Sequence, residues 1–240
     1  MRFVITRPRP DADALAKQLQ ELGHKSWLSP VMKMNWNKVE PPDPADISAL
    51  VITSRNALRS LEKWHDLSIY ADLPLFAVGK SSAKAARKRG FSNIFEAAER
   101  ARTLPALIDK HLDARKSAPL YHPGGKKLAF DIAPLLEELG FTLQRQIVYE
   151  TEPVNRLAPS VAKGLADATI DGVILLSPRS ARLFGALLKT SKLTDCLSSV
   201  SCLCLSQNVA DAVEGLCWRQ TLVAAHPDID HLLDLIKKID

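Results

Sequence analysis

The sequence lacks long apolar runs and any secretory signal pattern. Its longest apolar runs are short, such as residues 173–176, and none approaches the roughly 20 residues that a membrane-spanning helix needs. The N-terminus leads straight into a strand-like run at residues 3–6, without the apolar segment and small-residue cleavage site that mark a signal peptide. We therefore expect no membrane partner and a cytoplasmic location.

Signatures of metal and nucleotide sites are also missing. The cysteines contain no CxxC pair, and no histidine stands at a zinc-like spacing from them. Cys202 and Cys204 alternate within an apolar run, which predicts two small buried side chains on one face of a strand. There is no HExxH, no GxGxxG after a strand, no P-loop and no GxSxG. We expect no metal and no cofactor.

Charge of one sign is not strongly in excess. The 32 Lys and Arg residues against 27 Asp and Glu residues give a formal net charge of +5, which suits an anionic partner without identifying one. The densest basic run, residues 84–89, carries no aromatic side chain, whereas nucleic-acid surfaces interleave the two. We interpret it as the solvated face of a helix and predict no nucleic-acid partner.

What the sequence does contain is a regular alternation of short apolar strands with amphipathic helices. The helix expected at residues 11–22 shows the pattern, since Leu15, Leu19 and Leu22 repeat at helical spacing and Gly23 ends it. Such alternation predicts βαβ units, parallel sheets and the α/β class, with sites at the carboxyl ends of strands. The expected strands are residues 3–6, 49–53, 75–78, 119–122, 147–149, 173–176 and 201–205.

Three segments recur in the same order. Gly23 and Gly140 end similar helices 117 positions apart, and LVITSRNA from residue 50 resembles VILLSPRSA from residue 173. A third pair sets FAVGKSSA from residue 76 against CLCLSQNVA from residue 202. The recurrence indicates two similar α/β halves that could hold a small ligand in a cleft, although any α/β protein repeats such units.

Small hydroxyl residues follow several expected strands, directly before a helix. This position combines a hydroxyl with free backbone N–H groups, which favours anions, although a lone serine there can be only an N-cap. Each of these hydroxyls has an Arg or Lys nearby, which favours a ligand that carries carboxylates. The candidate residues are Thr6, Arg7, Ser54, Arg55, Lys80, Ser82, Ser177 and Arg179.

Short motifs stand in a fixed order over nearly the whole chain. They are VITRP from residue 4, ITSRNA from 52, AVG from 77, IVYET from 147, LLSPRSA from 175, LS from 205 with VA from 209, and AHPD from 225. In order and spacing they resemble the motifs of uroporphyrinogen-III synthases. The resemblance implies two flavodoxin-like parallel-sheet domains joined by two connecting strands. One domain would be discontinuous, residues 1–36 and 170–240, and residues 37–169 would form the inserted domain.

The resemblance also implies a reaction. The family converts hydroxymethylbilane, a linear tetrapyrrole with eight carboxylates, into uroporphyrinogen III. It does so by losing water, inverting the last pyrrole ring and closing the macrocycle without cofactor or metal. Tyr149 matches the family's tyrosine, and since a phenol is protonated at neutral pH it would donate a proton. A half-buried strand aromatic is the alternative for Tyr149.

Further substrate contacts come from the same resemblance. Ser82 stands where the family often has threonine, and Ser177 and Arg179 answer Ser54 and Arg55. The segment from Ser206 to Val209 departs from the family pattern; there, Asn208 can donate a hydrogen bond, whereas Val209 cannot. Gly124 and Gly125 complete the expected substrate-binding set. His122, beside them, could serve as a hydrogen-bond donor, but we interpret it as a residue of a surface loop.

Other functions stay open on the sequence alone. The main alternative is a catalytically inactive two-domain module that binds a tetrapyrrole or another polyanion. Periplasmic-binding-protein-like and glycosyltransferase architectures are further alternatives. The first normally carries a signal peptide, and the second an acidic DxD metal motif. Residues 11–13 and 228–230 have the DxD form, but both stand at expected helix starts, where aspartate caps are common. We expect a monomer with a small-molecule substrate, and leave open a transient contact with hydroxymethylbilane synthase.

Overall fold

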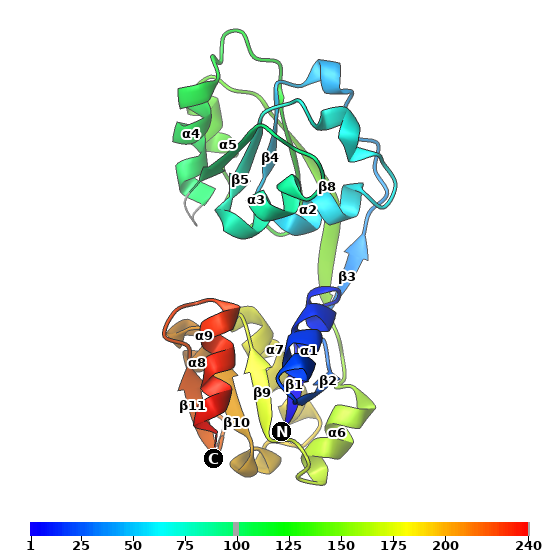
Figure 1. Cartoon of the computed structure of the whole chain (residues 1–240), viewed down its shortest axis with the longest axis vertical. Helices are drawn as coiled ribbons and strands as arrows, with labels where there is room; N and C mark the ends of the chain where they lie inside the picture. Colours follow the sequence, from blue (N-terminus) through cyan, green and yellow to red (C-terminus); the bar gives the residue numbers. More distant parts are fainter. Residues whose placement is uncertain (98–100, 240) are drawn as a thin grey trace. The chain divides into compact units, whose positions relative to one another are not determined.

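The computed structural model describes residues 1–97 and 101–239, and its chain divides into two compact units. Unit 1 comprises Met1–Met34 and Glu152–Asp240, and unit 2 comprises Asn35–Thr151. The chain leaves unit 1 within β3 (Met32–Trp36) and returns within β8 (Leu143–Pro153), two strands that are neighbours in one sheet (Figure 1).

The second crossing differs from the sequence expectation. The inserted domain was expected to end near residue 169, whereas unit 2 ends at Thr151. The intervening segment contains α6 (Pro159–Ala166), which buries Val161 and Leu165 in the same core cluster as Val173 of unit 1. Because this helix covers the unit 1 sheet, its segment belongs to unit 1.

Unit 1 is built on a five-stranded parallel sheet. Its strands are β1 (Arg2–Ile5), β2 (Lys25–Leu28), β9 (Gly172–Leu175), β10 (Ser201–Cys204) and β11 (Gln220–Val223). The spatial order is β2-β1-β9-β10-β11, with every neighbouring pair parallel. Counted along the unit, this is the 2-1-3-4-5 order of flavodoxin-like sheets.

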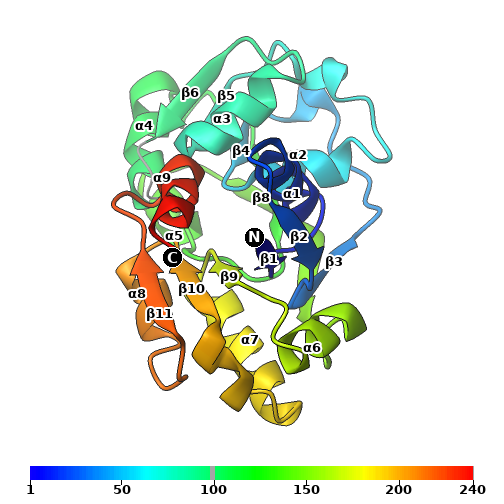
Figure 2. The same ribbon diagram turned by 60° about the horizontal axis from the view of Figure 1, so that its bottom comes forward.

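Helices cover both faces of this sheet, which is why its central strands are apolar throughout. On one face, α1 (Asp11–Glu21) and α9 (Ile229–Asp234) pack Leu15 and Leu232 against Ile5 and Ile174. On the other, α6 is joined by α7 (Pro178–Thr190) and α8 (Gln207–Asp211). Figure 2 shows these two groups of helices on opposite sides of the strands.

Unit 2 is built on a six-stranded sheet in the order β3-β8-β7-β4-β5-β6. Its other strands are β4 (Ala49–Ile52), β5 (Leu75–Val78), β6 (Ile94–Ala97) and β7 (Leu120–Gly125). One face is covered by α2 (Arg55–Leu61) and α3 (Gly79–Arg87), and the other by α4 (Leu104–His111) and α5 (Ala133–Glu138). Short 3₁₀ turns lie at Pro44–Asp46, Leu67–Tyr70, Ala101–Thr103, Asp195–Ser199 and Leu235–Lys238.

The two sheets have the same strand arrangement, but the chain forms the equivalent strands in a different order in each unit. Without β3, unit 2 reads β6-β5-β4-β7-β8 and unit 1 reads β11-β10-β9-β1-β2. The registers agree as well. Leu50 of β4 pairs with Tyr121 of β7, and at the equivalent position of unit 1 Val173 of β9 pairs with Val4 of β1. The three recurring sequence segments therefore mark equivalent places in the two units, and the α/β prediction is confirmed.

Local signals explain several helix ends. Ser54 caps α2 by accepting a hydrogen bond from the backbone N–H of Asn56, and Ser177 caps α7 by accepting from Ser180. Gly23 and Gly140, at φ of +81° and +85°, take the left-handed conformation that ends α1 and α5. Side-chain oxygens thus cap α2 and α7, and glycines end α1 and α5.

Candidate functional site

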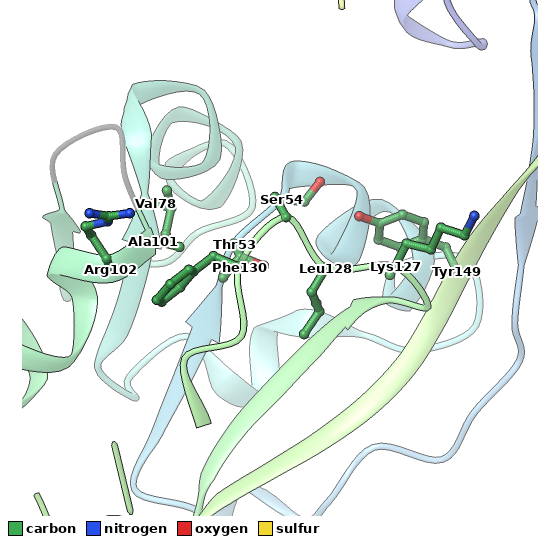
Figure 3. A pocket seen from close by; sticks show the side chains of 11 residues that line it. Thr53, Ser54, Val78, Ala101, Arg102, Lys127, Leu128, Phe130 and Tyr149 are labelled. Atoms are coloured by element: carbon green, nitrogen blue, oxygen red, sulfur yellow. The ribbon is translucent and has the colours of Figure 1, made fainter. Parts of the chain in front are cut away.

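A pocket of about 550 Å³ opens at the carboxyl ends of the unit 2 strands (Figure 3). Side chains from the ends of β4, β5 and β7 meet there with β8 and with the segment that follows β7. This is where parallel α/β sheets place ligands, because loops and helix N-termini converge there. The lining residues are Thr53, Ser54, Val78, Ala101, Arg102, Gly125, Lys127, Leu128, Ala129, Phe130 and Tyr149.

Tyr149 is held in the pocket by a close approach to the backbone of Gly125. A Cβ atom on Gly125 would lie 2.8 Å from Cε2 and Cζ of the Tyr149 ring, so a larger residue there would displace the ring. On β3, Trp36 lies 6.3 Å from that ring between centroids. In Figure 3 the phenol oxygen lies on the side of the ring nearer Ser54. The half-buried phenol therefore has a fixed position in the lining.

Two adjacent hydroxyl residues follow β4 at this pocket. Ser54 accepts a hydrogen bond from the Asn56 backbone N–H at 3.2 Å. The Oγ1 atom of Thr53 lies 3.1 Å from Nε2 of His122 on the neighbouring strand β7. Thr53 thus touches both the pocket and a buried imidazole.

Positive charge dominates the described lining, in which Arg102 and Lys127 are the charged residues. The Arg102 guanidinium lies 5.9 Å from the ring centroid of Phe130, a cation–π arrangement. Arg145 donates hydrogen bonds from Nη2 to the carbonyls of Gly125 at 2.8 Å and Lys126 at 3.2 Å, which holds the start of this segment in place. Two cations beside hydroxyl donors suit an anionic ligand that also has apolar parts.

Helix α3 brings backbone donors to the same pocket. Val78 lines the pocket and stands at the N-cap of α3, without a side-chain capping bond. The first-turn N–H groups of this helix are therefore open to an anion, with Lys80 exposed in that turn. Gly79, at φ of +72°, makes the turn from the strand into the helix.

The predicted site residues of unit 2 divide into three groups. Ser54, Gly125 and Tyr149 line the pocket, and Gly124 lies beside them at the end of β7. Arg55 starts α2 and donates to the Ser81 hydroxyl at 3.0 Å. Ser82, in contrast, is buried on the inner side of α3, where its equivalent in unit 1 is the core residue Val209.

The predicted residues of unit 1 gather at the carboxyl ends of β1, β9 and β10. Thr6 is buried and donates its hydroxyl hydrogen to the Ile174 carbonyl at 2.9 Å, and Arg7 pairs with Asp11 at 2.9 Å. Ser177 donates to the Ser180 hydroxyl at 2.9 Å as well as capping α7. The other predicted residues begin helices, Arg179 in α7 and Ser206 with Asn208 at α8.

The interpretation of His122 as a surface-loop residue is wrong. Strand β7 continues through Gly125, and the His122 side chain is 1% exposed within it. Burial lowers the pKa of His122 to about 4; the charge of Arg145 acts in the same direction and that of Asp131 against it. All six residues of β7 are buried, because this central strand is covered on both faces.

Sequence reasoning missed several other lining residues. Thr53 stands inside a motif from which only Ser54 and Arg55 were chosen, although both hydroxyls end the same strand. Arg102 and Phe130 come from separate segments, and nothing in their local sequence joins them to the pocket. Their contribution depends on how α4 and the segment after β7 pack.

No metal site or membrane span emerges from the part of the chain that the structure describes. Among residues 1–97 and 101–239, no group of three or more His, Cys, Asp or Glu side chains could hold a metal ion, and no helix is long and apolar enough to cross a membrane. Cys202 and Cys204 are buried in β10 with their Sγ atoms 3.5 Å apart, on one strand face as predicted.

Comparison with known families now bears on this site. Residues 13–234 match the sequence model of uroporphyrinogen-III synthase HemD. The chain belongs to the uroporphyrinogen-III synthase family. That assignment agrees with the sequence resemblance and covers both units. No curated protein sequence matches the chain.

Two solved structures share the uroporphyrinogen-III synthase fold with this chain. One is the uroporphyrinogen-III synthetase from Helicobacter pylori, 18% identical, with all of both chains covered and a TM-score of 0.65. The other is a mutant uroporphyrinogen III synthase from Thermus thermophilus, 17% identical, covering 100% of this chain and 98% of that one with a TM-score of 0.51. At these identities the likeness supports the fold, while the family assignment rests on the sequence match.

Proposed function

We propose that this chain is an active uroporphyrinogen-III synthase, a cyclising lyase that converts hydroxymethylbilane into uroporphyrinogen III in haem biosynthesis. The observation that supports this most directly is the unit 2 pocket, where a phenol, two hydroxyls and two cations meet. A substrate that carries carboxylates and must lose a hydroxyl group needs this combination of donors.

Tyr149 is the proton donor in this proposal. Its phenol O–H protonates the hydroxyl group that leaves the terminal pyrrole, and water departs as the pyrrole nitrogen lone pair forms the new double bond. The methylene carbon that lost water bonds to the substituted α-carbon of the last ring, which gives a spiro intermediate. The bond from that α-carbon to its bridging methylene then breaks, and the bridge bonds to the free α-carbon of the same ring, which inverts the ring. The final closure releases a proton from a pyrrole carbon, which restores the phenol and leaves water as the only net loss.

The remaining pocket residues bind and orient in this proposal. Arg102 and Lys127 attract carboxylates, Thr53 and Ser54 offer hydroxyls, and the open N–H groups of α3 add backbone donors. Orientation is central because the linear substrate also closes spontaneously to the wrong isomer. Holding reacting atoms in place can supply much of the required rate and all of the isomer selectivity.

A pocket of about 550 Å³ takes part of a linear tetrapyrrole rather than all of it. We propose that the strand ends of unit 1 supply further anion contacts, through Ser177, Arg179, Ser206 and Asn208. We also propose that the protein works as a cytoplasmic monomer, without a resident cofactor, on substrate released by hydroxymethylbilane synthase.

A coupled assay tests the proposed function. Hydroxymethylbilane is generated in place from porphobilinogen with hydroxymethylbilane synthase, this protein is added, and the products are oxidised and separated as type I and type III uroporphyrins. We expect predominantly type III product. Type I product alone, at the spontaneous rate and with folded protein, would contradict catalysis and favour an inactive tetrapyrrole-binding module.

A further inference from the structure

The polar pair formed by Thr53 and His122 has no counterpart in unit 1. By the shared register, His122 of β7 stands where Ile5 stands in β1, and Thr53 after β4 stands where Leu176 stands after β9. In unit 1, Ile5 is fully buried and Leu176 packs against the same core cluster. Since an apolar pair completes the sheet there, this fold does not require the hydrogen bond.

The surroundings of the His122 ring assign its tautomer. Nε2 lies 3.1 Å from Oγ1 of Thr53, while Nδ1 is buried with no hydrogen-bond partner among the described residues. Burial lowers the pKa of the ring to about 4, with Arg145 on β8 and Asp131 before α5 as the nearby charges, so the ring is neutral at physiological pH. A hydrogen on Nδ1 would be an orphaned buried donor, whereas a hydrogen on Nε2 has an acceptor.

The Nε2–H tautomer decides what the Thr53 hydroxyl can do. If Nε2 donates to Oγ1, the hydroxyl oxygen is used as an acceptor and its own hydrogen remains available. Thr53 lines the pocket, so that hydrogen can be donated to a ligand there. The opposite tautomer would direct the Thr53 hydrogen into the ring and away from the ligand.

We infer that His122 is a positioning residue, which holds the Thr53 hydroxyl as a hydrogen-bond donor to a carboxylate of the ligand in the unit 2 pocket. Gly124 supports this arrangement, because a Cβ atom there would lie 3.3 Å from Nε2 and crowd the ring. The inference rests on the proposed function, since it specifies one contact of the same site. An ionised carboxylate can accept hydrogen bonds but cannot donate them, so a directed O–H donor suits it.

The tautomer is measured directly on the folded wild-type protein by ¹⁵N NMR of labelled histidine. We expect the two ring-nitrogen shifts of a neutral Nε2–H imidazole for His122, unchanged between pH 8 and pH 5.5. A proton on Nδ1, or a charged ring in this range, would overturn the inference. This measurement needs no substrate, so it stands even if the coupled assay yields only type I product.

Matched variants test the positioning role in turnover. His122→Gln keeps a donor, because its amide nitrogen is the same number of bonds from Cα as Nε2, whereas His122→Met removes it. We expect His122→Met to raise KM for hydroxymethylbilane about fivefold and Gln to restore it to within about twofold. Thr53→Val should raise KM similarly, and the Thr53→Val, His122→Met double variant should be no worse than Thr53→Val alone.

A merely structural histidine would behave differently. It would give effects of Thr53→Val and His122→Met that multiply in the double variant, and a glutamine variant no better than the methionine variant. Either result contradicts the inference. Thermal unfolding of each variant shows whether the chain is folded; should a His122 variant fail to fold, the wild-type ¹⁵N spectrum decides the question.

Discussion

Both units carry hydroxyl residues at the carboxyl ends of their strands, but the hydrogen bonds of these residues differ. In unit 1 the Thr6 hydroxyl donates to the Ile174 carbonyl, and Ser177 bonds to Ser180 on its own helix. In unit 2, Thr53 and Ser54 line a pocket together with a phenol and two cations. The same backbone arrangement thus carries hydroxyls bonded within unit 1, whereas the half-buried hydroxyls of unit 2 also line a pocket.

The difference arises from the strands that flank these hydroxyls. Strand β7 ends in Gly124 and Gly125, which leave room for the His122 imidazole and the Tyr149 ring. The equivalent strand β1 runs into Thr6 and Arg7, whose side chains are engaged with the sheet and with α1. Removing side chains at one strand end is what makes space for a pocket there.

The largest expected effect comes from closing that space. Gly125→Ala places a Cβ atom 2.8 Å from the Tyr149 ring, which displaces the phenol and fills part of the pocket. We expect formation of type III uroporphyrinogen to fall about 10²-fold, the scale of a misplacement near 1 Å. Gly215→Ala in unit 1 is the control, because no atom lies within 4 Å of a Cβ built there. Equal activity of Gly125→Ala and wild type would contradict the positioning of Tyr149.

The second largest effect should come from acid, which we expect to destabilise unit 2 more than unit 1. The pKa of His122 is lowered to about 4 in the folded chain from an ordinary value of 6.5, so the unfolded chain binds a proton first as the pH falls. The contribution of the neutral His122 ring to the free energy of unfolding is therefore fully present above about pH 6.5, and it declines as the pH falls from there to pH 4. From pH 7.5 to pH 5 the loss is about 2 kcal/mol in unit 2.

Hydrogen exchange at the two pH values measures this loss strand by strand. Amides of β7 should lose protection at pH 5, after correction for intrinsic exchange rates, more than those of the equivalent strand β1, where Ile5 replaces the histidine. His122→Gln should remove the difference. Equal losses in β1 and β7 would show that another group controls the acid response.

Removing the phenol oxygen should have a smaller effect than displacing the ring. We expect Tyr149→Phe to reduce turnover roughly tenfold, less than the ~10²–10⁴ of a typical general acid, because orientation supplies much of the catalysis. Tyr121→Phe is a matched control in the same unit, since its hydroxyl bonds to Gln146 at 2.5 Å away from the pocket lining. Unchanged turnover in Tyr149→Phe would remove this residue from the proton transfer.

The smallest expected effect concerns charge. Arg102→Ala with Lys127→Ala removes both cations of the pocket lining and should raise KM about fivefold at low salt, less at high salt because the interaction is screened. Arg179→Ala in unit 1 should raise KM about twofold. A larger effect in unit 1 would reverse the comparison and place the main carboxylate contacts there.

Local patterns in the sequence account for much of this protein. Periodicity predicts the α/β class, capping residues and glycines predict some of the helix ends, and the recurring segments predict the equivalence of the two units. Tyr149 and Ser54 could also be predicted as site residues, since each ends or continues a recognisable strand motif. These features depend on residues within a few positions of one another, so the sequence displays them directly.

The tertiary structure alone decided the contacts that turn these motifs into a pocket. Thr53 meets His122 across 69 positions, and Arg102 reaches Phe130 from another segment. Ser82 faces the core rather than the pocket. Successive side chains of a helix point about 100° apart, so a shift of one position decides which face a residue takes. Strand register and helix packing fix these relations, and both are set by the burial of side chains that lie far apart in the chain.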